Sequence, residues 1–112
     1  MKYIIAVIKP SKLNDVRRAL SEIGVKGVTV SDVRGFGRQG GTTEQYRGTE
    51  FEVSFVAKVK IEIACNASAA NDIVKAIQRS ANTGQLGDGK VFIMDMQDVM
   101  RIRTGETGAD AL

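Results

Sequence analysis

Residues 33–52 constrain the fold more than any other part of this chain. This segment holds five of the 12 glycines and three arginines, and its second half shows neither strand alternation nor helical spacing. Such a segment cannot bury itself as a helix or a strand, and a long unpatterned loop in a short chain is typically functional or disordered. We therefore expect a long loop, ordered at its base and mobile at its tip, between two regular segments.

The part of the chain before this loop predicts a strand, a helix and a second strand. The apolar run over residues 3–8 is typical of a strand covered on both faces. After Pro10, Ser11 can cap a helix, and Gly24 can end it. The apolar residues of this helix share one face: Leu13, Val16, Leu20 and Ile23. The second strand, over residues 28–33, leads into the loop.

The part of the chain after the loop continues the alternation of strands and helices. Residues 51–63 alternate between apolar and polar side chains, which predicts a strand with one packed and one wet face. A second amphipathic helix begins at Asn66 or Ser68, and its apolar residues are Ala70, Ile73, Val74, Ile77 and Ala81. Strands over residues 90–94 and 99–103 follow. The order βαββαβ predicts an α+β fold, a ferredoxin-like plait with a long loop between strands two and three.

Composition narrows the possible functions. A length of 112 residues predicts a single domain over residues 1–112, and a net charge of +3 is too mild to single out a partner. The chain has only one cysteine, Cys65, which excludes an internal disulfide. It has no histidine, the side chain that most often acts as a base at neutral pH. No apolar run approaches the about 20 residues of a membrane helix. We therefore expect a cytosolic protein that is not an enzyme and does not insert directly into a membrane.

Two glycine motifs resemble nucleotide-binding loops without fitting them fully. Gly35, Gly37 and Gly40 match G-x-G-x-x-G, but no helical pattern follows, as a dinucleotide-binding motif requires. Residues 84–90 match the G-x4-G-K of a P-loop, yet Val91 stands where a magnesium-binding Ser or Thr is needed. Gly84 is better explained as a helix terminator. The remaining glycines and the lysine of this segment could still hold a phosphate, because glycine allows backbone amides to converge on an anion.

RNA binding is the alternative function. Residues 34–37 match the first four positions of the RNP1 motif, and the order βαββαβ is also that of an RNA-recognition domain. RNP1 continues with aromatic residues that stack on bases, whereas Arg38 and Gln39 occupy those positions here.

Near the C-terminus, Arg101 and Arg103 would project to the same side of a strand. Together with the two glycine segments, they favour one nucleotide triphosphate site where the elements converge.

The chain resembles the PII signal-transduction proteins over essentially all of its residues. The carriers are V-R-G-F-G-R-Q at 33–39, T-E-Q-Y-R-G-T-E at 43–50, T-G-Q-L-G-D-G-K at 83–90 and R-I-R-T-G-E at 101–106. The resemblance implies a homotrimer with clefts between its subunits. Each cleft would bind ATP or ADP competitively, and 2-oxoglutarate together with Mg²⁺ and ATP.

The resemblance also assigns residues to these ligands. The implied ATP or ADP contacts are Thr29, Gly37, Arg38, Gln39, Ala64, Gly87, Asp88, Gly89, Lys90, Arg101 and Arg103. The implied 2-oxoglutarate contacts are Gln39, Gly40, Gly41, Lys58 and Gly87. Gln39 would also bind Mg²⁺, because a hard cation prefers oxygen ligands. The cation would separate the dicarboxylate from the triphosphate, which would otherwise repel each other.

The loop, which we place at about residues 37–55, would carry the output of the protein. The resemblance implies that Arg47 contacts a partner, such as an ammonium transporter, or that the loop acts on enzymes or regulators of nitrogen metabolism. Such a transporter would recruit this cytoplasmic protein to the membrane. No nucleic acid is implied, and ATP hydrolysis would at most be a weak side activity.

This sequence departs from the family pattern at several positions. Many relatives carry a uridylylated tyrosine where this chain has Phe51, which has no hydroxyl to modify. Tyr46 and Thr49 offer hydroxyls, but nothing in the sequence shows that either is modified. Gly40 stands where lysine is usual, and Asn82 stands where arginine or tyrosine is frequent. We expect a paralogue that responds to ligand binding alone.

Overall fold

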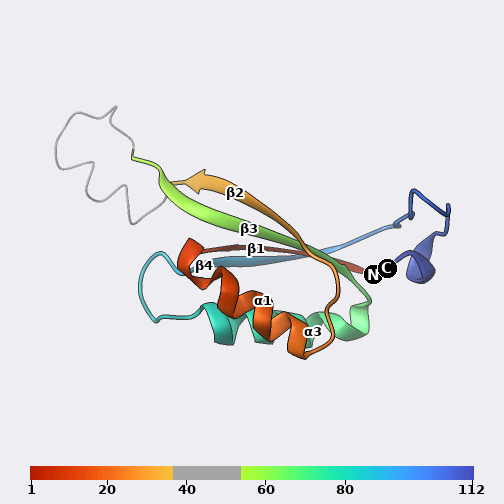
Figure 1. Cartoon of the computed structure of the whole chain (residues 1–112), viewed down its shortest axis with the longest axis horizontal. Helices are drawn as coiled ribbons and strands as arrows, with labels where there is room; N and C mark the ends of the chain where they lie inside the picture. Colours follow the sequence, from red (N-terminus) through yellow and green to blue (C-terminus); the bar gives the residue numbers. More distant parts are fainter. Residues whose placement is uncertain (37–53) are drawn as a thin grey trace.

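The computed structural model describes residues 1–36 and 54–112, which form a four-stranded sheet with two α-helices packed on one face (Figure 1). The strands are β1 (Lys2–Ile8), β2 (Thr29–Gly35), β3 (Val56–Cys65) and β4 (Gly89–Asp95). The α-helices are α1 (Leu13–Glu22) and α3 (Ala67–Ala81), and two short 3-10 helices are η1 (Pro10–Lys12) and η2 (Gly108–Ala111). This order confirms the predicted ferredoxin-like α+β plait.

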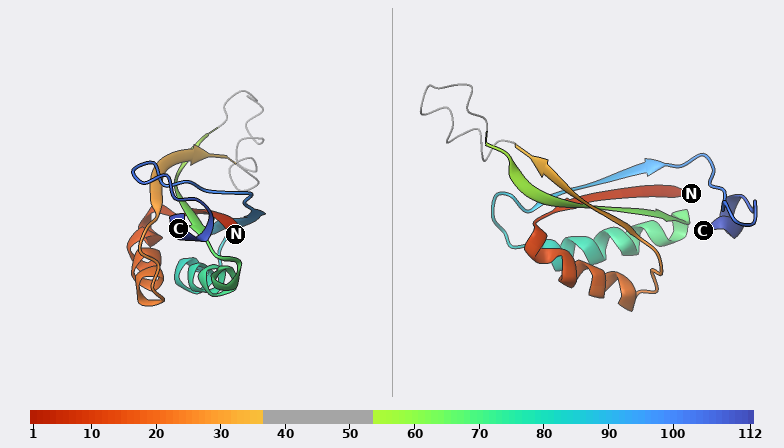
Figure 2. Two further views of the ribbon diagram at one scale, coloured as in Figure 1. Left: turned by 90° about the vertical axis from the view of Figure 1, so that its right-hand side faces the viewer. Right: turned by 45° about the horizontal axis from the view of Figure 1, so that its top comes forward.

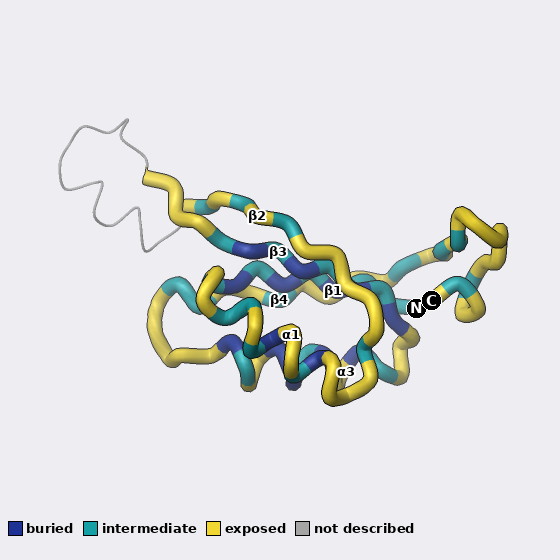
Figure 3. Tube along the Cα trace, viewed as in Figure 1, coloured by how far each residue is buried: buried dark blue, intermediate teal, exposed yellow. Residues whose placement is uncertain are grey.

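The sheet has the order β2-β3-β1-β4, and every neighbouring pair is antiparallel. Strand β1 is central: Ile4 lies opposite Ile63 of β3 and Ile93 of β4. Alternate residues of β1 and β3 point toward the helices and are buried, as Figure 3 shows in dark blue. The buried core is Ile4, Ala6, Ile8, Val16, Leu20, Val59, Ile61, Ile63, Cys65, Ala70, Ile73, Ala76, Ile77 and Ala81.

Among the residues that the structure describes, no helix covers the other face of the sheet, as the two views of Figure 2 show. We call it the open face. From the strand register its residues are Tyr3, Ile5, Val7, Thr29, Ser31, Val33, Lys58, Lys60, Glu62, Ala64, Lys90, Phe92 and Met94. Within a single chain, therefore, helices cover only one face of β1, and the expectation that both of its faces are covered is wrong. Phe92 and Met94 remain 47% and 42% exposed.

The start of α1 differs from the prediction. Ser11 does not cap this helix, because Pro10–Lys12 form the 3-10 helix η1 and Lys12 occupies the N-cap position. The predicted end of the helix is confirmed: it stops at Glu22, and Gly24 follows with a φ of +90°. Asn66 is the N-cap residue of α3, although its side chain makes no capping hydrogen bond.

The predicted fifth strand over residues 99–103 does not form. Met100 makes only an isolated bridge with Thr107, and residues 102–104 form a turn. The segment folds back on itself because the Arg101 amide donates to the Glu106 carbonyl and the Gly108 amide donates to the Val99 carbonyl. Within residues 1–36 and 54–112, no helix combines the length and apolar character needed to cross a membrane.

Candidate functional site

The loop that joins α3 to β4, residues 82–88, lies at the end of the sheet where β1 finishes, because Gly89 pairs with Ile8. Its glycines Gly84, Gly87 and Gly89 have φ values of +81°, +95° and +102°. At Gly89 a Cβ would lie 1.8 Å from the carbonyl oxygen of Val7. Only glycine allows this conformation and this close approach. The backbone of β4 therefore begins pressed against β1, which fixes the position of the loop.

Lys58 of β3 reaches across to this loop. Its Nζ donates a hydrogen bond of 2.5 Å to the carbonyl oxygen of Gly87. Two more lysines, Lys60 and Lys90, lie on the open face on either side of Val7. This end of the open face thus carries three lysines, of which Lys58 contacts the glycine loop, and such a concentration of positive charge suits an anion.

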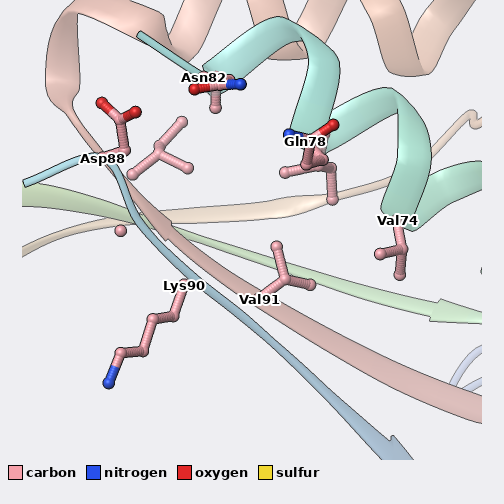
Figure 4. A pocket seen from close by; sticks show the side chains of 10 residues that line it. Val74, Gln78, Asn82, Asp88, Lys90 and Val91 are labelled. Carbon is pink, nitrogen blue, oxygen red and sulfur yellow. The ribbon is translucent and has the colours of Figure 1, made fainter. Parts of the chain in front are cut away.

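Asp88 points back into its own loop, where it accepts hydrogen bonds from Thr83 and Gly84 and pairs with Lys9. Behind it lies a cavity of about 330 Å³ between α3 and β4. In Figure 4, Val74 and Val91 face this cavity, whereas the Lys90 side chain points away from it. The cavity is therefore largely apolar, and the charge of Lys90 is directed toward the open face.

The predicted nucleotide contacts Thr29, Ala64, Arg101 and Arg103 lie toward the opposite end of the sheet. Thr29 opens β2 opposite Glu62, and Ala64 lies opposite Tyr3 near the start of β1. The segment after β4, residues 96–112, leaves the sheet at the same end, since the Met96 amide donates to the carbonyl of Met1. Arg101 and Arg103 lie in this segment.

The two arginines differ in their surroundings. Arg101 Nη1 pairs with Glu106 Oε1 at 3.1 Å, and its Nη2 donates to the carbonyl oxygen of Leu112 at 3.3 Å. Arg103 is exposed in the turn over residues 102–104. The prediction that both project from one side of a strand is therefore wrong. Arg101 is oriented by its own segment, whereas Arg103 projects from a turn.

A single chain does not bring these two groups of residues together. The first group lies beside Ile8, and the second beside Tyr3. Five residues of strand separate these positions, which corresponds to about 17 Å. Figure 1 shows the two groups at opposite ends, with the 82–88 loop on the left and the segment 96–112 on the right. In one chain, therefore, the two groups do not converge, and each end presents only part of the described residues that the sequence predicts for a nucleotide site.

Several predicted residues lie outside the described part of the chain. They are Gly37, Arg38, Gln39, Gly40, Gly41, Tyr46, Arg47, Thr49 and Phe51. The residues that flank them are described. Phe36 and Phe55 pack edge to face with ring centroids 5.3 Å apart, and the guanidinium of Arg34 lies 5.8 Å from the centre of the Phe55 ring. These contacts join the ends of β2 and β3 on either side of the loop.

Sequence reasoning missed two residues of this region, Lys9 and Thr83. Thr83 lies inside the quoted motif at 83–90, where a hydroxyl near an Asp-Gly pair is a usable turn signal. Lys9 gave no local signal, because it is separated from Asp88 by most of the chain. Among residues 1–36 and 54–112, no group of three or more acidic, histidine or cysteine side chains could hold a metal ion.

The chain is thus an α+β plait of the ferredoxin class, and the end of its sheet beside the 82–88 loop has glycines and lysines that suit an anion. Residues 1–106 match the family described as nitrogen regulatory protein P-II. Two relatives match over the full length of both chains: nitrogen regulatory protein P-II of Azospirillum brasilense, 53% identical, and nitrogen regulatory protein GlnK of Escherichia coli K12, 49% identical. A crystal structure of Arabidopsis thaliana PII bound to citrate superposes with a TM-score of 0.83 at 40% identity, covering 99% of this chain and 91% of that one.

The chain therefore belongs to the nitrogen regulatory protein P-II family. This confirms the resemblance drawn from the motifs and the expected regulatory role in nitrogen metabolism. The alternative of an RNA-recognition domain finds no support in these comparisons. Members of this family are regulatory signal transducers, which agrees with the expected non-enzymatic role.

Proposed function

We propose that this chain senses ATP or ADP, and 2-oxoglutarate with Mg²⁺, in clefts between the subunits of a homotrimer. Residues 1–112 act as one domain, and the loop at about residues 37–55 passes the ligand state to a partner protein. The observation that carries the proposal is the separation of the two half-sites. Residues that suit a phosphate lie at one end of the sheet, and Thr29, Ala64, Arg101 and Arg103 lie at the other.

A second copy completes the site when the loop end of one protomer meets the opposite end of its neighbour. Contacts between unlike ends close into a ring when the rotation between subunits closes. The open face supports such an assembly, because Phe92 and Met94 are half exposed on a face without a helix. Exposed apolar patches of this kind mark interaction surfaces. A trimer that turns its open faces inward would bury them.

The described residues fit a bound nucleotide triphosphate. Gly87 and Gly89 free the backbone to approach phosphate, and Lys90 adds a cation on the open face. From the neighbouring protomer, Arg103 offers an exposed guanidinium and Ala64 offers a small apolar surface. The region of Gly37, Arg38 and Gln39, together with the backbone of Asp88, completes the proposed nucleotide contacts.

The bond from Lys58 to Gly87 marks the proposed 2-oxoglutarate site. A lysine that already donates to a neutral carbonyl can exchange that acceptor for a carboxylate, which forms the stronger, charge-assisted bond. Gly40 and Gly41 would supply amides to the other carboxylate. The likeness to a PII structure bound to citrate supports a small carboxylate ligand, since citrate and 2-oxoglutarate are both carboxylates.

The described residues fit Mg²⁺ only as a complex with the nucleotide. They contain no cluster of metal-ligating side chains, and cationic groups surround the loop. Mg²⁺ is often held by substrate phosphates and only one or two protein oxygens. Gln39 would supply such an oxygen, and the bound ion would offset charge between the triphosphate and 2-oxoglutarate.

The output passes through Arg47 and its loop to a partner such as an ammonium transporter, or to enzymes and regulators of nitrogen metabolism. The protein works in the cytoplasm and reaches a membrane only through such a partner. A ligand can shift the loop only if it binds two loop states with different affinity. The proposed contacts to Gln39, Gly40 and Gly41 at the base of the loop provide that difference.

Isothermal titration calorimetry tests this proposal. ATP should bind saturably, and 2-oxoglutarate should strengthen the binding only when Mg²⁺ is present. Lys90→Ala should weaken ATP binding by about 10- to 100-fold, the loss expected for one charge-assisted hydrogen bond. Lys58→Met should retain ATP binding and lose the 2-oxoglutarate effect. Lys75→Ala, which removes an exposed lysine from α3, is the matched control and should change neither result. Absence of ATP binding by the unmodified protein would refute the proposal.

A further inference from the structure

The carboxylate of Asp88 is the centre of the 82–88 loop. One oxygen, Oδ2, accepts from the backbone amides of Thr83 at 2.8 Å and Gly84 at 2.9 Å. The other, Oδ1, accepts from the Thr83 hydroxyl at 2.5 Å and lies 3.3 Å from the Nζ of Lys9. Lys9 Nζ also donates to the Thr83 hydroxyl at 3.2 Å. Both oxygens are thus used inside the loop.

This arrangement keeps a negative charge beside the proposed phosphate site. The hydrogen bonds from Thr83, with smaller contributions from Lys9 and Gly84, hold the pKa of the Asp88 carboxyl well below its ordinary value, so the group is ionised at neutral pH. The side chain is 22% exposed. If Asp88 acted only through its charge, it would repel a triphosphate, and removing it would strengthen ATP binding.

The geometry points to the opposite effect. We propose that Asp88 is a positioning residue that holds the turn from Thr83 to Gly84, and the ammonium of Lys9, so that the Gly87–Lys90 backbone is already in place to receive phosphate. This inference rests on the proposed nucleotide site. In this role the Asp88 side chain does not itself contact the phosphate.

The loop has few other fixed points. Its two ends are set by the last turn of α3 and by the close contact of Gly89 with Val7. Between them, Gly84 and Gly87 have positive φ values, and glycine loses more conformational freedom on ordering than any other residue. Lys58 holds Gly87 from one side, but in the proposed function it turns to 2-oxoglutarate when that ligand binds. Asp88 would then be the main internal constraint on the loop.

Lys9 has a second effect in this arrangement. It lies at the end of β1, pairs with Asp88 and is 27% exposed. Pairing compensates the charge of the carboxylate and reduces its repulsion of phosphate. The loop therefore gains a fixed shape from Asp88 without a large loss of positive potential.

Two variants separate positioning from simple electrostatics. Asp88→Asn removes a negative charge and weakens the bonds to Thr83 and Lys9. Thr83→Val preserves every charge and removes only the hydroxyl that donates to Asp88. Asp95→Asn is the matched control, because it removes the exposed ion pair between Asp95, the last residue of β4, and Lys2 of β1, far from the 82–88 loop. ATP affinity is measured by calorimetry, and exchange of the Thr83 and Gly84 amides by NMR.

We expect both Asp88→Asn and Thr83→Val to weaken ATP binding by about tenfold, which is 1.4 kcal/mol, and to speed exchange of the two amides. Asp95→Asn should leave both measurements unchanged. If Asp88→Asn binds ATP as tightly as the unmodified protein, or more tightly, with Thr83→Val unaffected, the inference is wrong. If Asp88→Asn does not fold, Thr83→Val alone decides, since it alters no charge. Failure of the unmodified protein to bind ATP would instead refute the proposed function.

Discussion

Gly89→Ala should destabilise the fold more than alanine at Gly24, Gly84, Gly105 or Gly108, which are positive-φ glycines where a Cβ would meet nothing within 4 Å. Gly89 has a φ of +102°, and a Cβ there would lie 1.8 Å from the Val7 oxygen and 2.8 Å from the Val7 carbonyl carbon. The left-handed conformation alone costs an L-residue about 1–2 kcal/mol. A contact of 1.8 Å with backbone cannot be relieved by a side-chain movement, so the pair between Gly89 and Ile8 must open.

Opening that pair adds about 0.5–1.5 kcal/mol for each hydrogen bond lost, which gives a total of about 2–5 kcal/mol. With a urea m-value of about 1–2 kcal/mol/M, the unfolding midpoint should fall by at least about 1 M. The measurement is equilibrium unfolding in urea at one fixed protein concentration, because an oligomer's stability depends on concentration.

Gly24→Ala is the matched control. Gly24 has a φ of +90°, but a Cβ at this position meets nothing within 4 Å. This variant should therefore show only the conformational cost of about 1–2 kcal/mol. Equal losses in the two variants would refute the claim that Gly89 is required by its contact with β1.

Three further predictions concern the core, the thiol and the loop. Ile77→Ala should cost about 2–5 kcal/mol in urea unfolding because Ile77 is 1% exposed, whereas Ile102→Ala, at a 94% exposed residue, should change little. Burial raises the pKa of the Cys65 thiol, so a thiol reagent at neutral pH should react slowly with the native protein and quickly in urea; equal rates would contradict this burial. Because the pKa of Asp88 is lowered in the fold, its contribution to stability is complete above its ordinary value of 3.8 and is lost as the pH falls below it. The urea midpoint should therefore fall more steeply with acidification in the unmodified protein than in Asp88→Asn; parallel curves would show that Lys9 and Thr83 do not stabilise the charged form.

The fold was largely predictable because its hydrophobic pattern is regular. The alternation of Val59, Ile61 and Ile63 with lysine and glutamate predicted which face of β3 is buried, and the structure confirms it. The prediction of a fifth strand over residues 99–103 is wrong because contacts beyond the local sequence decide the conformation of this segment. Hydrogen bonds within the segment 96–112 replace the pairing that a strand would need.

The candidate site was predictable only where its signal is local. Glycines and a lysine within residues 84–90 identified the anion-suited loop. The bonds from Lys58 to Gly87 and from Lys9 to Asp88 join residues far apart in the sequence, so no spacing rule could predict them. The separation of Arg103 from Lys90 was also hidden, because it depends on the length of β4 and on the way the segment 96–112 folds back beyond the far end of that strand.

The central claim is that the nucleotide site is completed by a neighbouring protomer, and complementation between two defective variants tests it most directly. Lys90→Ala damages one half-site, and Arg103→Ala damages the other. Each variant alone should bind ATP weakly. Unfolding the two in urea and refolding them together in equal amounts would create mixed forms of the proposed homotrimer, in which some clefts combine two undamaged halves.

With random mixing of two variants in a ring, about a quarter of all clefts should be intact. Calorimetry of the co-refolded mixture should then show tight ATP sites at about a quarter of the number found in the unmodified protein. The same variants mixed without unfolding provide the control, and should show none. If co-refolding restores no tight site although mixed assemblies form, each site lies within one chain, and our account of the protein is wrong.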